Sequence, residues 1–217
     1  MSTSKSKVAI IGVGNIGKVV AANLVKGNRP VIIASRKLEE AKTLAQELGN
    51  LATAVEIPAA IKEAEIIVLA IWFNSIKEFL SQYAVELQGK IIIDPSNPIA
   101  PDGNGGFRKI IDASESAGNV IAKLLPKGAK LVKTLGTLAA GSLSSASRRK
   151  PEAAVLFYAT DDNSVNGKIE ELIKDSGFEA LHVGKIDQSI RIEVFGDLHE
   201  FGALGKTVTL SEAKTKI

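Results

Sequence analysis

The stretch "GVGNIG" at residues 12–17 has the glycine spacing G-x-G-x-x-G. In this pattern Gly12 permits a tight turn, Gly14 lets the backbone approach a pyrophosphate, and the third glycine lets a helix pack closely on a strand. The N–H groups of Asn15 and Ile16 would then open a helix towards the anion, helped by its dipole. Because the turn follows the apolar stretch 7–13, it predicts a dinucleotide site; the alternative is a purely structural turn.

The next apolar stretch, 29–35, ends in Ser35 and is followed by Arg36 and Lys37. A carboxylate at this place would accept hydrogen bonds from the ribose hydroxyls of NAD, but it would repel a 2′-phosphate. A guanidinium binds phosphate through two parallel hydrogen bonds, and a hydroxyl adds a further donor. The three residues therefore predict an NADP site, with a solvated strand end as the alternative.

Three further strand ends carry candidate site residues, because ligands of doubly wound sheets bind beyond the carboxyl ends of the strands. The first is Ala70-Ile71-Trp72, in which the single tryptophan would wall the nicotinamide pocket or act as a core aromatic. The second holds Asn97, whose amide would hydrogen-bond the nicotinamide half of the cofactor. The alternative is that the side chain fixes a proline-rich turn. The third is Leu138-Ala139-Ala140, whose small side chains would let a flat ring approach closely. The alternative is that these residues only begin a helix.

No residue stands out as a catalytic acid or base. The two tyrosines, Tyr83 and Tyr158, lack the lysine four residues later that short-chain dehydrogenases require. His182 and His199 are interpreted as structural. Hydride transfer between two flat rings needs stacking at about 3–3.5 Å rather than a strong acid. A reductase of small carbonyls or imines would need a proton donor, for which His199, Glu200 or a Ser/Thr is available.

Composition narrows the class of protein. The chain has 217 residues, a net charge of +3, 45% hydrophobic residues and no cysteine. Disulfides, thiolate metal sites and cysteine nucleophiles are excluded, and no metal site is predicted. We find no nucleic-acid-binding motif, no signal peptide and no apolar run near the roughly 20 residues of a membrane span. A cytoplasmic protein is expected, acting on small-molecule cofactors without nucleic-acid or membrane partners.

Short apolar runs alternate with helical patterns, which predicts a doubly wound, mostly parallel α/β sheet of the Rossmann type. We predict a NADP-binding core over 7–138 and a small C-terminal lobe over 139–217 that extends the sheet. The residues 95–106 and 139–152 are predicted loops. Strands are predicted over 7–13, 29–35, 51–55, 65–71, 90–95, 129–135, 153–159 and 178–184, and helices over 15–26, 38–48, 74–87, 113–125, 163–175 and 190–201.

The stretches "IIGVGNIG" (10–17), "ASR" (34–36), "VLAIWF" (68–73) and "GDLHEFG" (196–202) resemble the NADPH-dependent oxidoreductases that use the deazaflavin coenzyme F420. The reductase domain of the six-transmembrane ferric reductases is a relative of this family. The resemblance implies hydride transfer between NADPH and a deazaflavin, or a flavin such as FMN. It also implies that Gly12, Gly14, Asn15, Ile16, Ser35 and Arg36 hold NADP.

Two other functions stay open at this stage. One is the NADPH-dependent reduction of a small carbonyl or imine, and the other is a non-catalytic NADPH sensor. The basic stretch 148–150 either attracts the anionic tail of the deazaflavin or forms a solvated loop. A homodimer is possible, because the C-terminal tail is poorly suited to closing a monomer.

The phosphate assignment predicts the effect of Arg36→Ala. Since a charge-assisted hydrogen bond contributes about 1.5–3 kcal/mol, we expect NADPH binding to weaken about 10–100-fold and NADH binding to stay nearly unchanged. Fluorescence titration with both cofactors measures the two affinities. Equal losses for NADPH and NADH would contradict the assignment.

Overall fold

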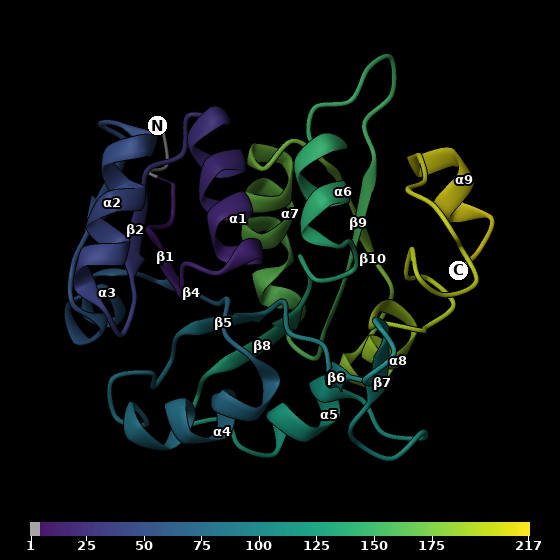
Figure 1. Cartoon of the computed structure of the whole chain (residues 1–217), viewed down its shortest axis with the longest axis horizontal. Helices are drawn as coiled ribbons and strands as arrows, with labels where there is room; N and C mark the ends of the chain where they lie inside the picture. The colour runs from purple at the N-terminus through teal and green to yellow at the C-terminus, as the bar shows by residue number, and fades with distance from the viewer. Residues whose placement is uncertain (1–4) are drawn as a thin grey trace.

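The computed structural model describes residues 5–217, which form one eight-stranded sheet flanked by helices (Figure 1). The strand order is β10-β9-β8-β5-β4-β1-β2-β3, and all neighbours are parallel except β8 and β9. The predicted doubly wound, mostly parallel fold is confirmed. The strands are β1 (Val8–Ile11), β2 (Val31–Ala34), β3 (Ala52–Ala54), β4 (Ile66–Leu69), β5 (Ile91–Asp94), β8 (Lys130–Lys133), β9 (Val155–Thr160) and β10 (Glu179–His182).

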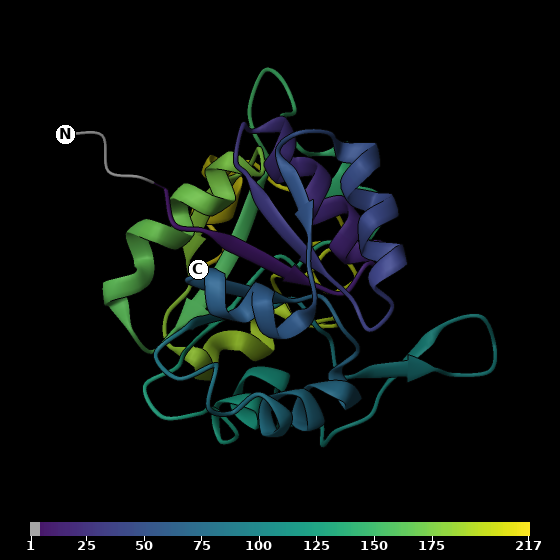
Figure 2. The same ribbon diagram turned by 90° about the vertical axis from the view of Figure 1, so that its left-hand side faces the viewer.

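The continuous apolar runs form parallel strands because both faces of the sheet are buried. In β1, Val8 and Ile10 enter the core on one face, whereas Ala9 and Ile11 enter the core on the other. The first core is covered by α1 (Asn15–Lys26), α2 (Leu38–Leu48), α6 (Ala140–Ser145) and α7 (Asn166–Asp175). The second is covered by α3 (Ile57–Glu63), α4 (Phe73–Gln82) and α5 (Ala117–Ala122), and Figures 1 and 2 show the two helix layers.

The chain reverses its winding direction between β1 and β4, which are neighbours in the sheet. This is the switch point at which ligands enter doubly wound folds. The loops after β1, β2, β4, β5 and β8 all leave the same edge, because these strands run parallel. The residues that follow these strands therefore meet along one crevice.

The C-terminal part extends the sheet through β9 and β10 and adds α8 (Ser189–Ile192) and α9 (Leu210–Lys214). Two short 3-10 helices, Asn163–Val165 and Ile186–Gln188, precede α7 and α8. Residues 193–209 contain no helix or strand and pass over the loops at the carboxyl edge. A domain boundary at 138/139 stays a prediction, although one sheet runs across it.

The predicted helix over 190–201 is wrong, since α8 ends at Ile192. Glu193 is extended, Phe195 has a φ of +73°, and a side chain at Gly196 would collide with the carbonyl oxygens of α8. Short-range hydrogen bonds, from the N–H of Gly196 to Glu193 and from the N–H of His199 to Gly196, turn the chain here. The segment also binds to other loops.

Other helices and strands differ from the predicted ones where tertiary contacts override the local preference of the sequence. The predicted loop 95–106 contains β6 (Ile99–Pro101), which pairs with β7 (Phe107–Lys109) in a hairpin that projects from the body in Figure 2. The predicted loop 139–152 contains α6, whose Leu143 is buried against α1. The helix α3 was not predicted. The helix predicted over 74–87 ends at Gln82, and that over 113–125 shortens to α5.

No helix within residues 5–217 is long and apolar enough to cross a bilayer.

Arg29 joins the start of β2 to α7 and predicts a stability effect. It is 1% exposed, and its guanidinium donates to Asp175 and Glu171 at 2.6 Å and to the carbonyl of Ser6 at 2.9 Å. Arg29→Ala removes these three hydrogen bonds, two of them to carboxylates, and takes away the donor of the Ser6 carbonyl, so we expect the free energy of unfolding to fall by about 3 kcal/mol. Urea denaturation measures this change.

Lys42→Ala is the matched control. Lys42 pairs with Glu39 at 2.7 Å, but both side chains are largely exposed. Removal of this pair should cost less than about 0.5 kcal/mol. Similar losses in the two variants would contradict the assigned role of Arg29.

Candidate cofactor and substrate site

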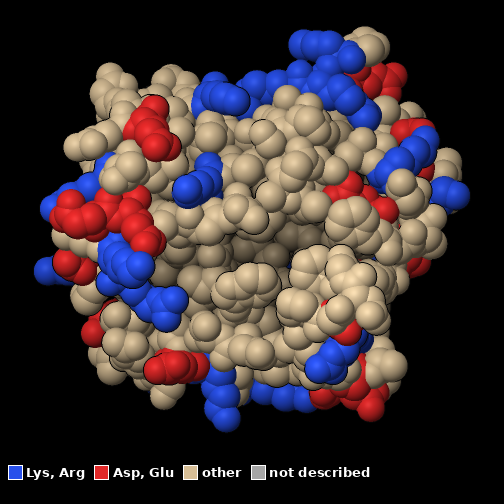
Figure 3. Space-filling model, in the orientation of Figure 1, with Lys and Arg blue, Asp and Glu red and all other residues tan. Residues whose placement is uncertain are grey.

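A single cavity of about 1460 Å³ runs along the carboxyl edge of the sheet, from the ends of β2 and β3 to the end of β8. The C-terminal segment contributes Val194, Phe195, His199 and Phe201 to its lining. Figure 3 shows the hollow near the centre of this face, surrounded mainly by uncharged side chains. All residues that the sequence predicted for cofactor binding line this cavity, whereas their contacts with a ligand stay predictions.

The glycine turn has the geometry of an anion cradle. Gly12 has a φ of +106°, and a Cβ there would collide with the carbonyl oxygen of Ala70 across the switch point. A Cβ at Gly14 would meet nothing within 4 Å. Gly14 also caps α1 without a side-chain hydrogen bond, and the first turn of α1 holds no acidic residue. The amide groups of this helix therefore face the cavity without competition, which fits a pyrophosphate.

Ser35, Arg36 and Lys37 line the end of the cavity beside β2. Ser35 is buried, and its Oγ accepts a hydrogen bond from the N–H of Lys37 at 3.3 Å. Lys37 pairs with Glu40 at 3.1 Å. Within residues 5–217, no carboxylate forms an ion pair with the exposed Arg36. Its guanidinium therefore remains available for an anionic ligand.

Asn97 lies where three segments meet. Its Nδ2 donates to the carbonyl of Gly136 at 3.0 Å, and its Oδ1 accepts from the N–H of Val194 at 2.7 Å. The side chain thus holds the loop after β5 against the loop after β8 and the C-terminal segment. Its predicted contact with the nicotinamide half would have to use the remaining proton or lone pair of the amide.

A buried ionic cluster beneath the cavity was missed by sequence reasoning. Asp94 ends β5 and Lys133 ends β8; their Oδ2 and Nζ atoms lie 2.7 Å apart, and both side chains are at most 4% exposed. Lys133 also lies 3.9 Å from Glu193 and donates to the carbonyl of Ser96. Glu193 accepts from the first amides of α5, at 2.8 and 3.0 Å. The cluster fixes the base of the cavity. In the sequence, its only signal was a charged residue at the end of the two apolar runs that form β5 and β8.

His199 is held as a neutral, structural group. Its Nδ1 accepts from the N–H of Phe201 at 3.0 Å, so its Nε2 carries the proton and donates to the carbonyl of Gly136 at 3.2 Å. Burial lowers the pKa of His199, although the hydrogen bond to Gly136 opposes this shift. Glu200 accepts from the N–H of Ala139 at the start of α6. His182 stacks on Tyr158, with ring centroids 4.8 Å apart, outside the cavity lining.

Aromatic residues at the far end of the cavity were also missed. Phe107 comes from the hairpin, and Phe195 and Phe201 come from the C-terminal segment. All three are at least half exposed although they line the same cavity. Scattered phenylalanines carry no periodic signal, so only the fold could bring them together.

The basic stretch 148–150 does not line the cavity. Arg148 donates to the carbonyl of Asn23 at 2.9 Å, and Arg149 donates to Thr207 at 3.1 Å. These hydrogen bonds dock the loop on α1 and on the C-terminal segment. The hypothesis that this stretch attracts the tail of a second ligand is therefore wrong.

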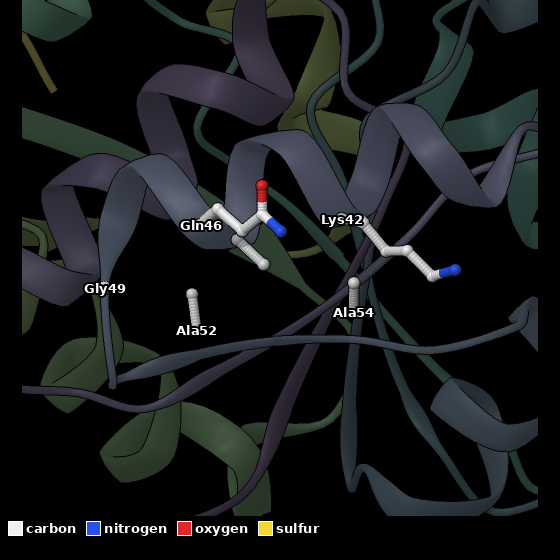
Figure 4. Close-up of a pocket in the computed structure, with 6 residues that line it drawn as sticks. Lys42, Gln46, Gly49, Ala52 and Ala54 are labelled. Atoms are coloured by element: carbon white, nitrogen blue, oxygen red, sulfur yellow. The ribbon is translucent and has the colours of Figure 1, made fainter.

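A second, shallower depression of about 310 Å³ lies between α2 and β3, at the edge of the sheet (Figure 4). Lys42, Gln46 and Gly49 line it together with small alanine side chains. Figure 4 shows the Lys42 and Gln46 side chains separated along α2, so they do not converge on one point. This depression offers no arrangement for chemistry.

Comparisons with known proteins indicate the class of protein. Residues 7–98 match the family described as "NADP oxidoreductase coenzyme F420-dependent". The chain is 25% identical over 203 residues to the F420-dependent NADP reductase of Methanocaldococcus jannaschii, which covers 88% of this chain and 90% of that protein. It is also 25% identical over 198 residues to the F420-dependent NADP reductase of Methanothermobacter marburgensis, with 86% and 88% covered. The crystal structure of a hypothetical protein from Sinorhizobium meliloti superposes with a TM-score of 0.82 at 26% identity and covers 95% of this chain and 96% of its own.

The fold, the cavity and these similarities define an NADP-dependent oxidoreductase with a Rossmann fold. The resemblance to the F420-dependent NADP oxidoreductases, predicted from the sequence motifs, is confirmed.

The geometry of the turn predicts opposite outcomes for two glycines. Gly14→Val places a branched side chain in open space, so the fold should persist while NADPH and NADH binding both weaken at least about tenfold. Gly12→Ala meets the Ala70 carbonyl in a left-handed backbone conformation, so it should lower the melting temperature. Circular dichroism melts and cofactor titrations separate the two effects. Intact binding in Gly14→Val would contradict the cradle.

Proposed function

We propose that this protein transfers hydride between NADPH and a deazaflavin or flavin-like ring. The observation that carries the proposal is the division of the cavity into two unlike ends. One end holds the glycine turn and the available Arg36, and the other is walled by aromatic rings and the small side chains at the start of α6. This arrangement suits a long anionic dinucleotide beside a flat second ring.

At the cofactor end, the amides that open α1 would hold the pyrophosphate, while Ser35 and Arg36 would hold the 2′-phosphate. When bound, NADPH supplies the hydride from its nicotinamide ring. Along β5 and β8, the cavity wall is formed by Asn97, Leu138 and Ala139. These side chains would set the depth to which the nicotinamide enters and would exclude water from one of its faces.

At the acceptor end, the protein would act by positioning rather than by proton transfer. The two ring nitrogens of His199 are engaged with backbone groups, and Glu200 accepts a backbone N–H. His199 cannot deliver its proton without breaking the hydrogen bond to Gly136, whereas only one oxygen of Glu200 is engaged. Holding two rings in a reactive arrangement can itself lower the barrier by about 7–11 kcal/mol.

Two other functions would require different behaviour. A reductase of small carbonyls or imines needs a proton donor beside the substrate. An NADPH sensor would bind NADPH without turnover. The two engaged ring nitrogens of His199 favour the ring acceptor over the first alternative, and the open aromatic end favours it over the second.

The direct test measures NADPH oxidation with coenzyme F420, FMN, a cyclic imine and a small ketone, alongside NADPH affinity. We expect turnover with at least one ring acceptor and no turnover with the imine or ketone. Turnover with the imine or ketone alone would support the carbonyl and imine reductase. Tight NADPH binding without turnover of any acceptor would support the sensor.

The positioning mechanism predicts the behaviour of two variants. His199→Gln keeps a donor for the Gly136 carbonyl but cannot act as an acid, so turnover should stay within about tenfold of the parent, whereas loss of a general acid costs about 10²–10⁴-fold. Ala139→Leu should block ring approach and lower kcat more than it weakens NADPH binding. Steady-state rates and NADPH titrations measure both. A thousandfold loss in His199→Gln with a harmless Ala139→Leu would contradict the mechanism.

A further inference from the structure

The two ends of the cavity differ in charge. Arg36 and Lys37 line the cofactor end, beyond β2. Around the acceptor end, beyond β5 and β8, the described lining residues include no lysine or arginine, and His199 is neutral. An anionic group bound at that end would thus lose water without gaining a cationic partner.

The acceptor end instead presents an unusual amount of exposed aromatic surface. Phe107, Phe195 and Phe201 are 50%, 51% and 60% exposed, and they come from two separate segments of the chain. Large apolar side chains that cluster in the open around one cavity are typical of a ligand site. Aromatic faces stack well on flat conjugated rings. The walls therefore favour a ring as the bound group.

Two cations of the C-terminal part are engaged with other groups. Arg191 pairs with Asp197 at 2.8 Å and donates to the carbonyl of Lys216 at 3.0 Å. Lys206 pairs with Glu212 at 2.7 Å.

The two cations of the hairpin, Arg108 and Lys109, also do not line the cavity. Lys109 donates to the carbonyls of Ala113 and Glu115. Arg108 follows Phe107 in β7, and successive side chains of a strand point to opposite faces, so Arg108 faces away from the cavity.

We infer that the acceptor half binds a flavin- or deazaflavin-type substrate through its ring and does not bind an anionic tail. This inference rests on the proposed function and narrows its substrate class. In the reaction, the C4–H bond of the dihydronicotinamide breaks and its hydride forms a bond to the acceptor ring. A proton from solvent completes the two-electron reduction, and NADP⁺ is released. The phosphate of FMN, or the phosphate and glutamyl tail of the deazaflavin, would remain in water.

Riboflavin and FMN form a matched pair for the test, because they differ only by the phosphate. We expect kcat/KM with riboflavin to equal or exceed that with FMN, and the KM for either acceptor to be insensitive to salt. A cation that reads the phosphate would make FMN at least about tenfold better at low salt, and this advantage would shrink as salt is added. That result would overturn the inference while leaving the proposed function in place.

The deazaflavin provides a second matched pair, the full coenzyme and its chromophore without phosphate and glutamyl groups. Comparable kcat/KM values would support the inference, and a preference of about tenfold or more for the full coenzyme would overturn it. Binding of NADPH without reduction of any of the four acceptors would refute the proposed function, and the inference with it.

Variants test the same idea from the protein side. Phe201→Ala should raise the KM for riboflavin several-fold while the Kd for NADPH is unchanged, and Val85→Ala, exposed outside the cavity, is the control. Phe107→Lys should install the missing cation and raise the ratio of FMN to riboflavin kcat/KM by about fivefold at low salt. Val85→Lys controls for net charge. An unchanged ratio in Phe107→Lys would show that this wall does not face the acceptor and would overturn the inference.

Discussion

Lys133 lies almost fully buried between two carboxylates, and the shape of the site depends on this arrangement. The ammonium group contacts Asp94 and lies near Glu193, and these groups come from β5, β8 and the chain beyond α8. Desolvation of such charges is costly unless every group keeps its partners, so the three segments are restricted to one arrangement. The backbone amides that open α5 bind Glu193 as well and extend the constraint to that helix.

The C-terminal segment owes its place to hydrogen bonds rather than to secondary structure. Val194 donates to Asn97, His199 donates to the carbonyl of Gly136, and Glu200 binds the start of α6. Each bond joins the segment to a loop at the carboxyl edge of the sheet. As a result, Phe195 and Phe201 face the cavity even though no helix or strand carries them.

This construction separates two kinds of recognition within one crevice. The amino-terminal half of the sheet offers helix amides and cations, whose attraction to phosphate is electrostatic. The other half offers apolar and aromatic surface, whose attraction to a ring comes from burial and stacking. The proposed hydride transfer would take place where these halves meet, beside Asn97 and Ala139, and each half would hold its own ring.

The sequence by itself determined the features that depend on local chemistry. The apolar runs predicted the main strands, the glycine spacing predicted the turn after β1, and Ser35 with Arg36 predicted the cation-bearing end of the crevice. Tertiary structure alone decided the helix α6, the hairpin with Phe107 and the course of residues 193–209. Glycine and serine rarely favour a helix, yet α6 forms because Leu143 packs on α1. Asn97 and Val194 are 97 positions apart, and the periodicity of a chain reports contacts within a few residues, not which distant loops will share a hydrogen bond.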